Sequence, residues 1–504
     1  MTLARAPQCY YCPNQPGQPR SYLHDEPAVM RANNSGFDPV MQFTDRAGTL
    51  AQNGHPVDKV ELLVLGGTWA SYPLEYRKGF VRDLYYAANT FDQRKKRPRL
   101  SLAAEQALNE TAACKIIGLT LETRPDCVDF EELRRFRRYG CTRVQLGVQH
   151  TDDRILRRVN RGHGRAHAAR AVRLLKDSGF KVDIHLMPLL PGASPAADLA
   201  MFRDVLLSPD LQVDQWKIYP CEITPWTVIK KWYDEGKYVP YSEGELIDVL
   251  TRVKAKVHPW IRLNRVIRDI PNQYIYGGGV DRPNLRQDIG KRMAELGWAC
   301  QCIRCREVGG GAAGPMELVE RRYASSGGAE VFLSWETPDR ATLFAFLRLR
   351  LPGPGCRTPF AELAGAAYVR EVHVYGQLLA TEPATDGTGS AGDAAQHAGL
   401  GRSLMRRAEG LAARAGFARL AVISGVGTRT YYARLGYELR GEGRYSVREL
   451  GLADTARGLW QTVPYLGRSR RWPPPLRAKA AAVVAVCRLA GRLGRLGRLG
   501  AAAG

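Results

Sequence analysis

The sequence predicts an α/β protein in which a parallel barrel of six β/α units precedes a second domain of the α+β class. Between Asp58 and Pro271, short apolar runs rich in β-branched residues alternate with longer helical patterns, as expected for parallel strands buried on both faces. After the three glycines at 309–311 the pattern changes to longer strands of antiparallel character. The length of 504 residues also favours more than one domain.

The barrel strands carry polar residues where they end. We expect these strands at 60–68, 115–123, 142–149, 181–188, 214–220 and 261–267, with helices such as 75–89, 165–178 and 244–257 between them. The carboxyl ends of parallel barrel strands are where ligands bind. Gln149, His185 and Lys217 are therefore candidates for ligand contact, although a strand histidine can equally be a hydrogen-bonded core residue and Lys217 an ion-pair partner.

The second domain is expected to begin with a meander of strands at 330–337, 341–351 and 368–375. A loop rich in Gly, Ala, Thr and Ser follows, and a helical pattern then runs to Ala415. From Gly467 onward the low complexity predicts disorder.

The chain is strongly basic, with 73 Lys and Arg against 50 Asp and Glu. Such a charge suits nucleic acid, a phosphorylated cofactor or an anionic surface, and a solvated basic face explains it as well. No apolar run is long enough to span a bilayer, so we expect no membrane association. Eleven cysteines without a signal peptide predict thiols in a cytoplasmic protein rather than a disulfide framework.

Two groups of cysteines have the spacing of metal ligands. Cys9 and Cys12, with Tyr11 between them, can hold an iron–sulfur cluster, although a zinc knuckle or a redox dithiol has the same spacing. Cys300, Cys302 and Cys305 predict a zinc site whose fourth ligand is not evident. Three unliganded thiols are the alternative for this triplet.

A glycine-containing loop before the last long helix predicts a phosphate site. Gln396, Gly399 and Gly401 fit a pyrophosphate loop, in which backbone N–H groups at a helix N-terminus bind phosphates and glycine permits close approach. A surface turn is the ordinary alternative. The strand residues 371–374 and the pair Tyr431 and Tyr432 favour the phosphate site, because they precede and follow the loop as in GCN5-related acetyltransferases.

From about Cys9 to about Tyr445 the chain resembles the Elongator catalytic subunit family. The strings that carry the resemblance lie in both predicted domains. They are Cys12-Pro13, Glu26-Pro27, Arg31-Ala32, residues 55–61, Gly66-Gly67-Thr68, residues 122–126, 139–143, 161–163, 217–220, 268–271, 370–376 and 423–427. The triplet of cysteines is more similar to stand-alone prokaryotic-type members than to eukaryotic subunits.

The resemblance implies a partial TIM-like (β/α)6 radical S-adenosylmethionine (SAM) barrel followed by a GNAT acetyltransferase domain. It implies a cluster-binding segment at 1–57, the barrel at 58–298, a zinc-binding linker at 299–312, the acetyltransferase domain at 313–450 and a disordered basic tail at 451–504. The implied activity is that of a tRNA uridine(34) 5-carboxymethyl synthase. A 5′-deoxyadenosyl radical would abstract hydrogen from the acetyl group of acetyl-CoA, and the resulting carbon radical would add to uracil.

The same resemblance assigns roles to individual residues. A 4Fe-4S cluster would be held by Cys9 and Cys12, with SAM contacted by Tyr11, Gly66, Gly67 and Gln149. Lys59 and Tyr432 would be catalytic. The acetyl-CoA contacts would be Lys59, Glu371, Val372, His373, Val374, Gln396, Gly399, Leu400, Gly401, Arg402, Tyr431 and Tyr432. The cluster and the acyl donor would face each other across one cavity.

The implied partner is the anticodon loop of tRNA, together with other Elongator subunits in a eukaryotic setting. The family also requires a third cluster cysteine, which would lie upstream of Met1, so we expect the 1–57 segment to be truncated. Two alternatives follow from the missing thiolate: a protein lysine acetyltransferase that uses only the second domain, or an inactive tRNA-binding homologue.

Overall fold

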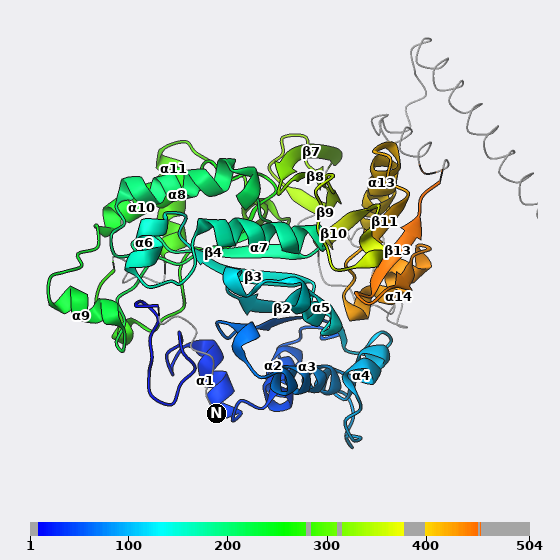
Figure 1. The fold of residues 1–504 in the computed structure, drawn as a ribbon, viewed down its shortest axis with the longest axis horizontal. Coiled ribbons are helices and arrows are strands. Elements are labelled where there is room, and N and C mark those ends of the chain that lie inside the picture. Colours follow the sequence, from blue (N-terminus) through cyan, green and yellow to red (C-terminus); the bar gives the residue numbers. More distant parts are fainter. Residues whose placement is uncertain (1–8, 279–283, 310–314, 377–398, 452–453, 455–504) are drawn as a thin grey trace, which may run out of the picture.

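The structure is a computed structural model that describes residues 9–278, 284–309, 315–376, 399–451 and 454. Its strands form a six-stranded sheet and a seven-stranded sheet, which lie side by side in Figure 1. The predicted fold class, a parallel β/α barrel followed by a mixed α/β domain, is confirmed. Within these residues, no helix combines the length and the apolar character that a bilayer crossing needs.

The first sheet is entirely parallel, and its strands lie in the order of the sequence. They are β1 (Lys59–Val64), β2 (Lys115–Thr123), β3 (Arg143–Gln149), β4 (Lys181–Leu186), β5 (Gln215–Ile218) and β6 (Arg262–Arg265). Each predicted strand is present. The first one ends sooner than expected, because Gly67 adopts a left-handed φ of +66°, which extended strand geometry excludes.

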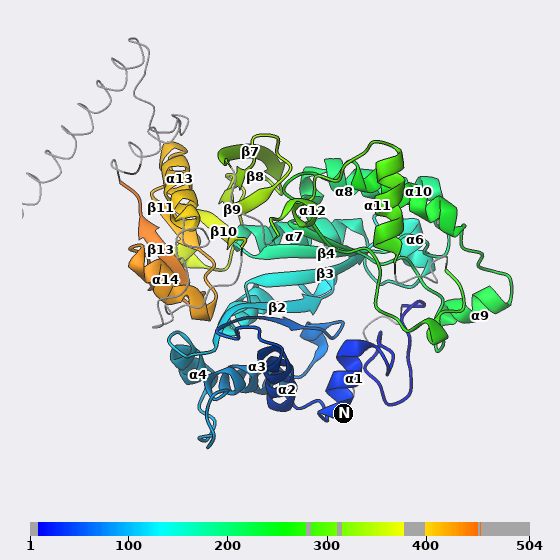
Figure 2. The ribbon, with the colours of Figure 1, turned by 180° about the vertical axis from the view of Figure 1, so that it is seen from behind.

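Helices connect the parallel strands and surround the sheet (Figures 1 and 2). They are α1 (Pro27–Asn34), α2 (Pro39–Gln52), α3 (Leu74–Asn89), α4 (Leu102–Asn109), α5 (Phe130–Arg138), α6 (Asp153–Arg158), α7 (Arg165–Asp177), α8 (Pro195–Leu207), α9 (Val228–Asp234), α10 (Glu243–Lys254), α11 (Leu285–Glu295) and α12 (Ile303–Arg306). Several begin at strong sequence signals. Ser242 and Glu245, for example, form a capping box that starts α10.

The second sheet is antiparallel except for one parallel pair, β10 with β11. Its strands are β7 (Glu317–Ser325), β8 (Gly328–Glu336), β9 (Leu343–Leu351), β10 (Ala366–Val374), β11 (Arg419–Val422), β12 (Glu438–Arg440) and β13 (Tyr445–Glu449), with helices α13 (Leu400–Arg414) and α14 (Arg429–Arg434). Sequence analysis found the meander β8, β9 and β10. It missed β7, whose charged and half-exposed residues give no apolar run.

A buried network of charges joins the two sheets. Arg370 on β10 donates to both carboxylate oxygens of Asp214 at 2.6 Å and also pairs with Glu330. Lys176 on α7 donates to Glu330 at 3.1 Å. Asp214 immediately precedes β5, so the second sheet packs against the amino ends of the barrel strands. Their carboxyl ends remain open to a ligand.

Candidate active sites at the two ends of the barrel

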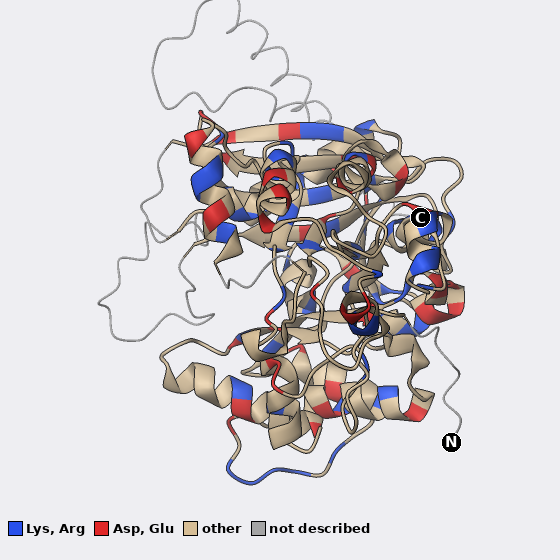
Figure 3. Cartoon of the chain, turned by 90° about the vertical axis from the view of Figure 1, so that its left-hand side faces the viewer, with Lys and Arg blue, Asp and Glu red and all other residues tan. Residues whose placement is uncertain are grey.

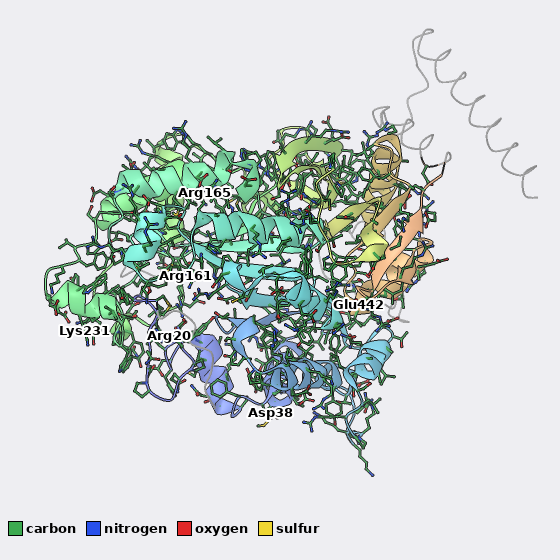
Figure 4. The ribbon with its side chains drawn as sticks, viewed as in Figure 1. Arg20, Asp38, Arg161, Arg165, Lys231 and Glu442 are labelled. Carbon is green, nitrogen blue, oxygen red and sulfur yellow. A yellow bond between two sulfur atoms is a disulfide. The ribbon has the colours of Figure 1, made fainter. Side chains whose placement is uncertain are left out.

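A cavity of about 410 Å³ lies at the carboxyl ends of the barrel strands. The strand-end residues that the sequence singled out line it: Gly67, Thr68, Glu122, Gln149, His185 and Lys217. Gly66 precedes this group and is not part of the lining. Figure 4 labels Arg20 and Arg161, which also line this cavity. The β/α pattern of the sequence thus located the ligand-binding end of the barrel.

Cys9 and Cys12 form part of the cavity wall and are 5% and 8% exposed. Their loop is anchored through Tyr10, whose N–H donates to Val159 O and whose carbonyl accepts from Val228 N. The structure joins the two sulfurs in a disulfide, whereas an iron–sulfur cluster is held by thiolates. The chemistry of the donors fits two cluster ligands once the bond is reduced. No other cysteine among the described residues lines this cavity, and residues 1–8 contain none.

Four residues of the cavity wall have buried polar atoms without a hydrogen-bond partner among the described residues. The atoms are Tyr11 Oη, Thr123 Oγ1, Gln149 Oε1 and both carboxyl oxygens of Glu222. Buried polar groups are normally satisfied by protein or by bound water, so a concentration of unsatisfied groups around one cavity indicates a polar ligand. Gln149 is also held at a φ of +74°, an unfavourable conformation that is common at functional sites.

The ionisable groups deeper in the cavity are coupled. Lys217 Nζ donates to Gln145 Oε1 at 2.7 Å, and His185 Nε2 lies 3.3 Å from the same oxygen. Burial, reinforced by the Lys217 charge, holds the pKa of His185 well below its usual value. Burial likewise raises the pKa of Glu122, which Lys217 partly offsets. His185 is therefore neutral at pH 7 and can act as a hydrogen-bond partner.

The second candidate site is the part of β10 that extends beyond its pairing with β11. The two strands pair only from Ala366 to Val369 on β10, so residues 370–374 diverge from β11. Helix α13 begins beside this part of β10, because a Cβ on Gly401 would meet Tyr431 Oη at 3.2 Å and Val374 Cγ2 at 3.6 Å. Gly399, at a left-handed φ of +73°, caps the helix. The first N–H groups of a helix have no intrahelical acceptor and suit phosphate groups.

The structure places the other predicted acetyl-CoA residues as follows. Glu371 is buried, and its carboxylate binds Arg348 Nε at 2.9 Å, so only its backbone is available to a ligand. Tyr432 packs into the core of the second sheet, whereas its neighbour Tyr431 is 40% exposed. Gln396 lies outside the described residues.

Lys59 lies at the start of β1, one strand from Lys115. A Cβ on Gly427 would meet Lys115 Cβ at 2.7 Å. Gly427 belongs to the turn that leads into α14 and Tyr431. Lys59 is therefore close to the second site, at the amino end of the barrel, and its ammonium lies 3.8 Å from Asp58.

Within the described residues, the cavity that contains Cys9 and Cys12 does not extend to the second candidate site, so the shared cavity implied by the resemblance stays a prediction. No described residue beyond Ile270 lines the cavity that contains Cys9 and Cys12, whereas β10 packs at the opposite ends of the same strands. At about 3.3 Å per residue, a strand of the length of β2 separates its ends by roughly 30 Å. Polar side chains inside the barrel bridge part of this distance, with Asn264 donating to Gln215 and Asp183.

Sequence analysis missed Glu222 and Tyr22, which also line the cavity. Glu222 lies four residues beyond the end of β5, so the available signal was an acidic residue in the loop after a predicted strand. Tyr22 lies in a segment without periodicity and gave no signal.

The triplet Cys300, Cys302 and Cys305 forms a compact group of sulfurs, all within 4.8 Å of one another. Hydrogen bonds from the other two thiols hold the pKa of Cys305 below its usual value, and Lys254 Nζ lies 3.8 Å from its sulfur. The same hydrogen bonds raise the pKa of Cys300, so only one of the three sulfurs favours the thiolate. Three sulfurs at this spacing fit a divalent metal. No fourth His, Cys, Asp or Glu of the described residues joins the group.

The chain is similar to known proteins over both of its domains. Residues 8–202 match the Radical SAM superfamily, and residues 213–295 match the Radical_SAM C-terminal domain. A tRNA uridine(34) acetyltransferase of Dehalococcoides mccartyi is 41% identical over 441 residues, which cover 86% of this chain and 92% of the relative. The chain belongs to the tRNA uridine(34) acetyltransferase and Elongator complex protein 3 family.

Other members of the Elongator complex protein 3 family agree with this placement. The human Elongator complex protein 3 is 39% identical over 455 residues, covering 88% of this chain and 80% of the relative. The solved structure of the archaeal Methanocaldococcus infernus Elp3 with an N-terminal deletion (1–46) is 38% identical. It superimposes with a TM-score of 0.75 over 84% of this chain and 97% of that one. Membership of the radical SAM superfamily implies a 4Fe-4S cluster and SAM.

Proposed function

We propose that this protein modifies uridine 34, the wobble base of tRNA, at carbon 5, using acetyl-CoA and SAM to install a carboxymethyl group. The observation that carries the proposal is similarity to tRNA uridine(34) acetyltransferases over both halves of the chain. Two separate candidate sites, one containing the cysteine pair and the other beside a helix N-terminus, support the use of two cofactors.

In this proposal the cavity binds the SAM and the uracil base. Reduced Cys9 and Cys12 hold the cluster, and Tyr11 and Gln149 direct their unsatisfied polar atoms at the ligands. A cluster with SAM would supply a radical able to abstract hydrogen from an acetyl methyl group, so the proposal requires that the acetyl group passes from the second site into this cavity.

The second site binds acetyl-CoA. Backbone N–H groups at residues 400–402 receive the pyrophosphate. Residues 372–374 of β10 pair with β9 but not with β11, and their edge toward β11 receives the pantetheine arm by backbone hydrogen bonds. Lys59 attracts the phosphate groups from the first strand of the barrel. Tyr431, which is exposed beside Gly401, contacts the cofactor more directly than the buried Tyr432.

Zinc is proposed for the triplet Cys300, Cys302 and Cys305, which lies where the chain leaves the barrel for the second sheet. Ile303 N donates to Ile261 O beside β6, and Arg306 pairs with Glu336 of β8 at 3.0 Å. A metal at this point would fix the two sheets relative to each other.

The tRNA partner is supported by the charge of the chain and by an exposed aromatic surface. Lys and Arg occur throughout the described chain (Figure 3). We define the α9 flank as Trp226, Lys230, Tyr274 and Tyr276. Trp226 and Tyr276 are 45% and 53% exposed, and Lys230 Nζ lies 4.4 Å from the centre of the Tyr276 ring. Exposed aromatic rings beside cations are typical of surfaces that stack unpaired bases.

The α9 flank borders the cavity, because Trp226 O accepts from Asn14 N, and Val228 N donates to Tyr10 O. Both partners belong to the cysteine loop or follow it directly. Figure 4 shows Lys231 of α9 on the same side of the molecule as Arg20 and Arg161. A base stacked on this flank would therefore lie near the cavity.

The test is nucleoside mass spectrometry after incubating the anaerobically reconstituted protein with tRNA, acetyl-CoA and SAM. A carboxymethyl group on uridine 34 supports the proposal. Cys9→Ala/Cys12→Ala is the matched control, which is expected to abolish this product and to retain acetyl-CoA binding. Absence of product from the wild-type protein contradicts the proposal.

A protein lysine acetyltransferase is the second candidate, favoured by the presence of only two cysteines in the described cavity wall. It predicts acetylation of protein lysines by wild type and by Cys9→Ala/Cys12→Ala alike. Acetyl-CoA hydrolysis that is stimulated by tRNA and leaves protein substrates unmodified excludes it.

A further inference from the structure

Glu222 is a buried acid without a hydrogen-bond partner in the part of the chain that the structure describes. It follows β5 by four residues, is 6% exposed and lines the cavity. Neither carboxyl oxygen has a hydrogen-bond partner among the described residues. Its side chain is therefore available to a molecule in the cavity.

Arg268, the cation that faces Glu222, is already paired with another acid. Arg268 donates to Glu26 Oε1 at 2.7 Å and to Glu26 Oε2 at 2.9 Å. Arg265 pairs with Asp269. Among the described residues, the charges that face Glu222 are therefore two acids, Glu26 and Asp269, and one arginine that is already bound to Glu26.

The excess of acids over cations around Glu222 determines its protonation state. A buried carboxylate without a partner is strongly unfavourable, so the carboxyl is expected to be protonated. Burial raises its pKa to about 8, and of the charges that face it Arg268 lowers the pKa while Glu26 and Asp269 raise it. At pH 7 the group offers one O–H donor and one C=O acceptor side by side.

We propose that the neutral carboxylic acid of Glu222 binds the imide edge of the uracil that is modified, accepting a hydrogen bond from N3–H and donating one to the C2 carbonyl. The inference rests on the proposed function and specifies how its substrate is recognised. Two parallel hydrogen bonds at N3 and the C2 carbonyl leave carbon 5, on the other side of the ring, free for the reaction. A ligand that presents an ammonium group to Glu222 would instead require the ionised carboxylate, which the neighbouring acids disfavour.

The test uses an anticodon stem-loop RNA with either uridine or 3-methyluridine at the wobble position, because the methyl group removes the N3–H donor. Wild type is expected to bind the uridine RNA about tenfold more tightly, as the loss of about 1.4 kcal/mol implies. Glu222→Gln keeps a donor and an acceptor and is expected to retain the preference. Glu222→Leu, of similar volume, is expected to bind both RNAs equally.

Two further measurements separate recognition of uracil from other roles. SAM affinity is expected to be the same in Glu222→Leu and wild type, and the thermal midpoint is expected to be unchanged or higher, because an unsatisfied buried acid is removed. Binding of the uridine RNA by wild type is expected to weaken as the pH rises through 8, where the acid ionises and loses the O–H that donates to the C2 carbonyl, and to stay constant in Glu222→Gln.

The inference is overturned if Glu222→Leu still prefers the uridine RNA. It is also overturned if this variant loses affinity for SAM while its RNA preference stays unchanged. Failure of the proposed function has a different signature. Wild type then makes no modified uridine and binds neither RNA.

Discussion

Polar side chains in and behind the cavity wall differ in the hydrogen bonds that the protein offers them. His163 packs behind this wall, where its Nε2 lies 3.0 Å from Arg161 Nε and 3.1 Å from Gly147 O. Burial, followed by the Arg161 charge, lowers the pKa of His163 to about 3. The folded protein therefore keeps this imidazole neutral at pH values where an unfolded chain protonates it.

The neutral His163 predicts a loss of stability in acid. Between pH 6.5 and about 3 only the unfolded state binds the proton, so the free energy of unfolding falls as the pH falls, by about 1.4 kcal/mol per unit. Urea unfolding of wild type and His163→Gln at pH 7, 6 and 5 measures this as a difference between the two proteins. Parallel stability curves would contradict the assignment.

The proposed phosphate site is most sensitive to a substitution of Gly401. Gly401→Val would place a branched side chain against Tyr431 Oη and Val374, so we expect acetyl-CoA to bind at least tenfold more weakly, as calorimetry would show. Gly79→Ala is the control, because a Cβ at Gly79 in α3 meets nothing within 4 Å. Equal affinity in Gly401→Val and wild type would place the cofactor elsewhere.

At the scale of elements, the loops that follow strands carry most of the candidate site residues, and helices hold these loops in place. The cysteine loop is held by backbone hydrogen bonds from Tyr10 to Val159, directly after α6, and from Val228 of α9 to Tyr10. Tyr10 also packs edge-on against Trp232 of α9 at 5.4 Å. Helix α9 therefore supports the cysteine loop and lies beside the α9 flank. A change on the flank is expected to affect RNA without disturbing the cavity.

Trp226→Ala and Tyr276→Ala test the α9 flank. Stacking of one base on an aromatic ring contributes about 1–3 kcal/mol, so each substitution is expected to weaken binding of single-stranded anticodon RNA about tenfold or more. Fluorescence anisotropy at constant salt measures this effect. Val239→Ala, at a residue that is 81% exposed near α9, is the control and should bind like wild type.

For the whole molecule, the buried charge network is what fixes the second sheet against the barrel. Asp214 and Glu330 are fully buried and share Arg370 and Lys176 as counter-charges, and Glu330 also pairs with Arg350. Removing one cation from such a network leaves an uncompensated buried charge. The relative position of the two candidate sites depends on these pairs.

Arg370→Met is expected to lower the free energy of unfolding by about 3–5 kcal/mol, because it strands Asp214 and Glu330. Arg440→Met removes exposed ion pairs with Glu438 and Glu449 and is expected to change stability by less than about 1 kcal/mol. Urea unfolding of both variants compares these values. Similar effects at the two positions would mean that the buried network does not hold the sheets together.

The sequence by itself determined the order of β/α units, the strand ends that line the cavity, and the glycines that start α13. These features depend on local periodicity and on conformations that few residues adopt, so neighbouring positions suffice to detect them. The half-exposed strand β7 escaped detection because it lacks an apolar run.

Only the tertiary structure decided which charges meet. Arg370 and Asp214 are 156 positions apart, and Glu26 and Arg268 are 242 apart, so no local spacing predicts either pair. Because Glu26 binds Arg268, the cation that faces Glu222, Glu222 has no hydrogen-bond partner among the described residues. The separation of the two candidate sites likewise follows from packing the second sheet against the amino ends of the barrel strands, a contact between segments that are distant in the chain.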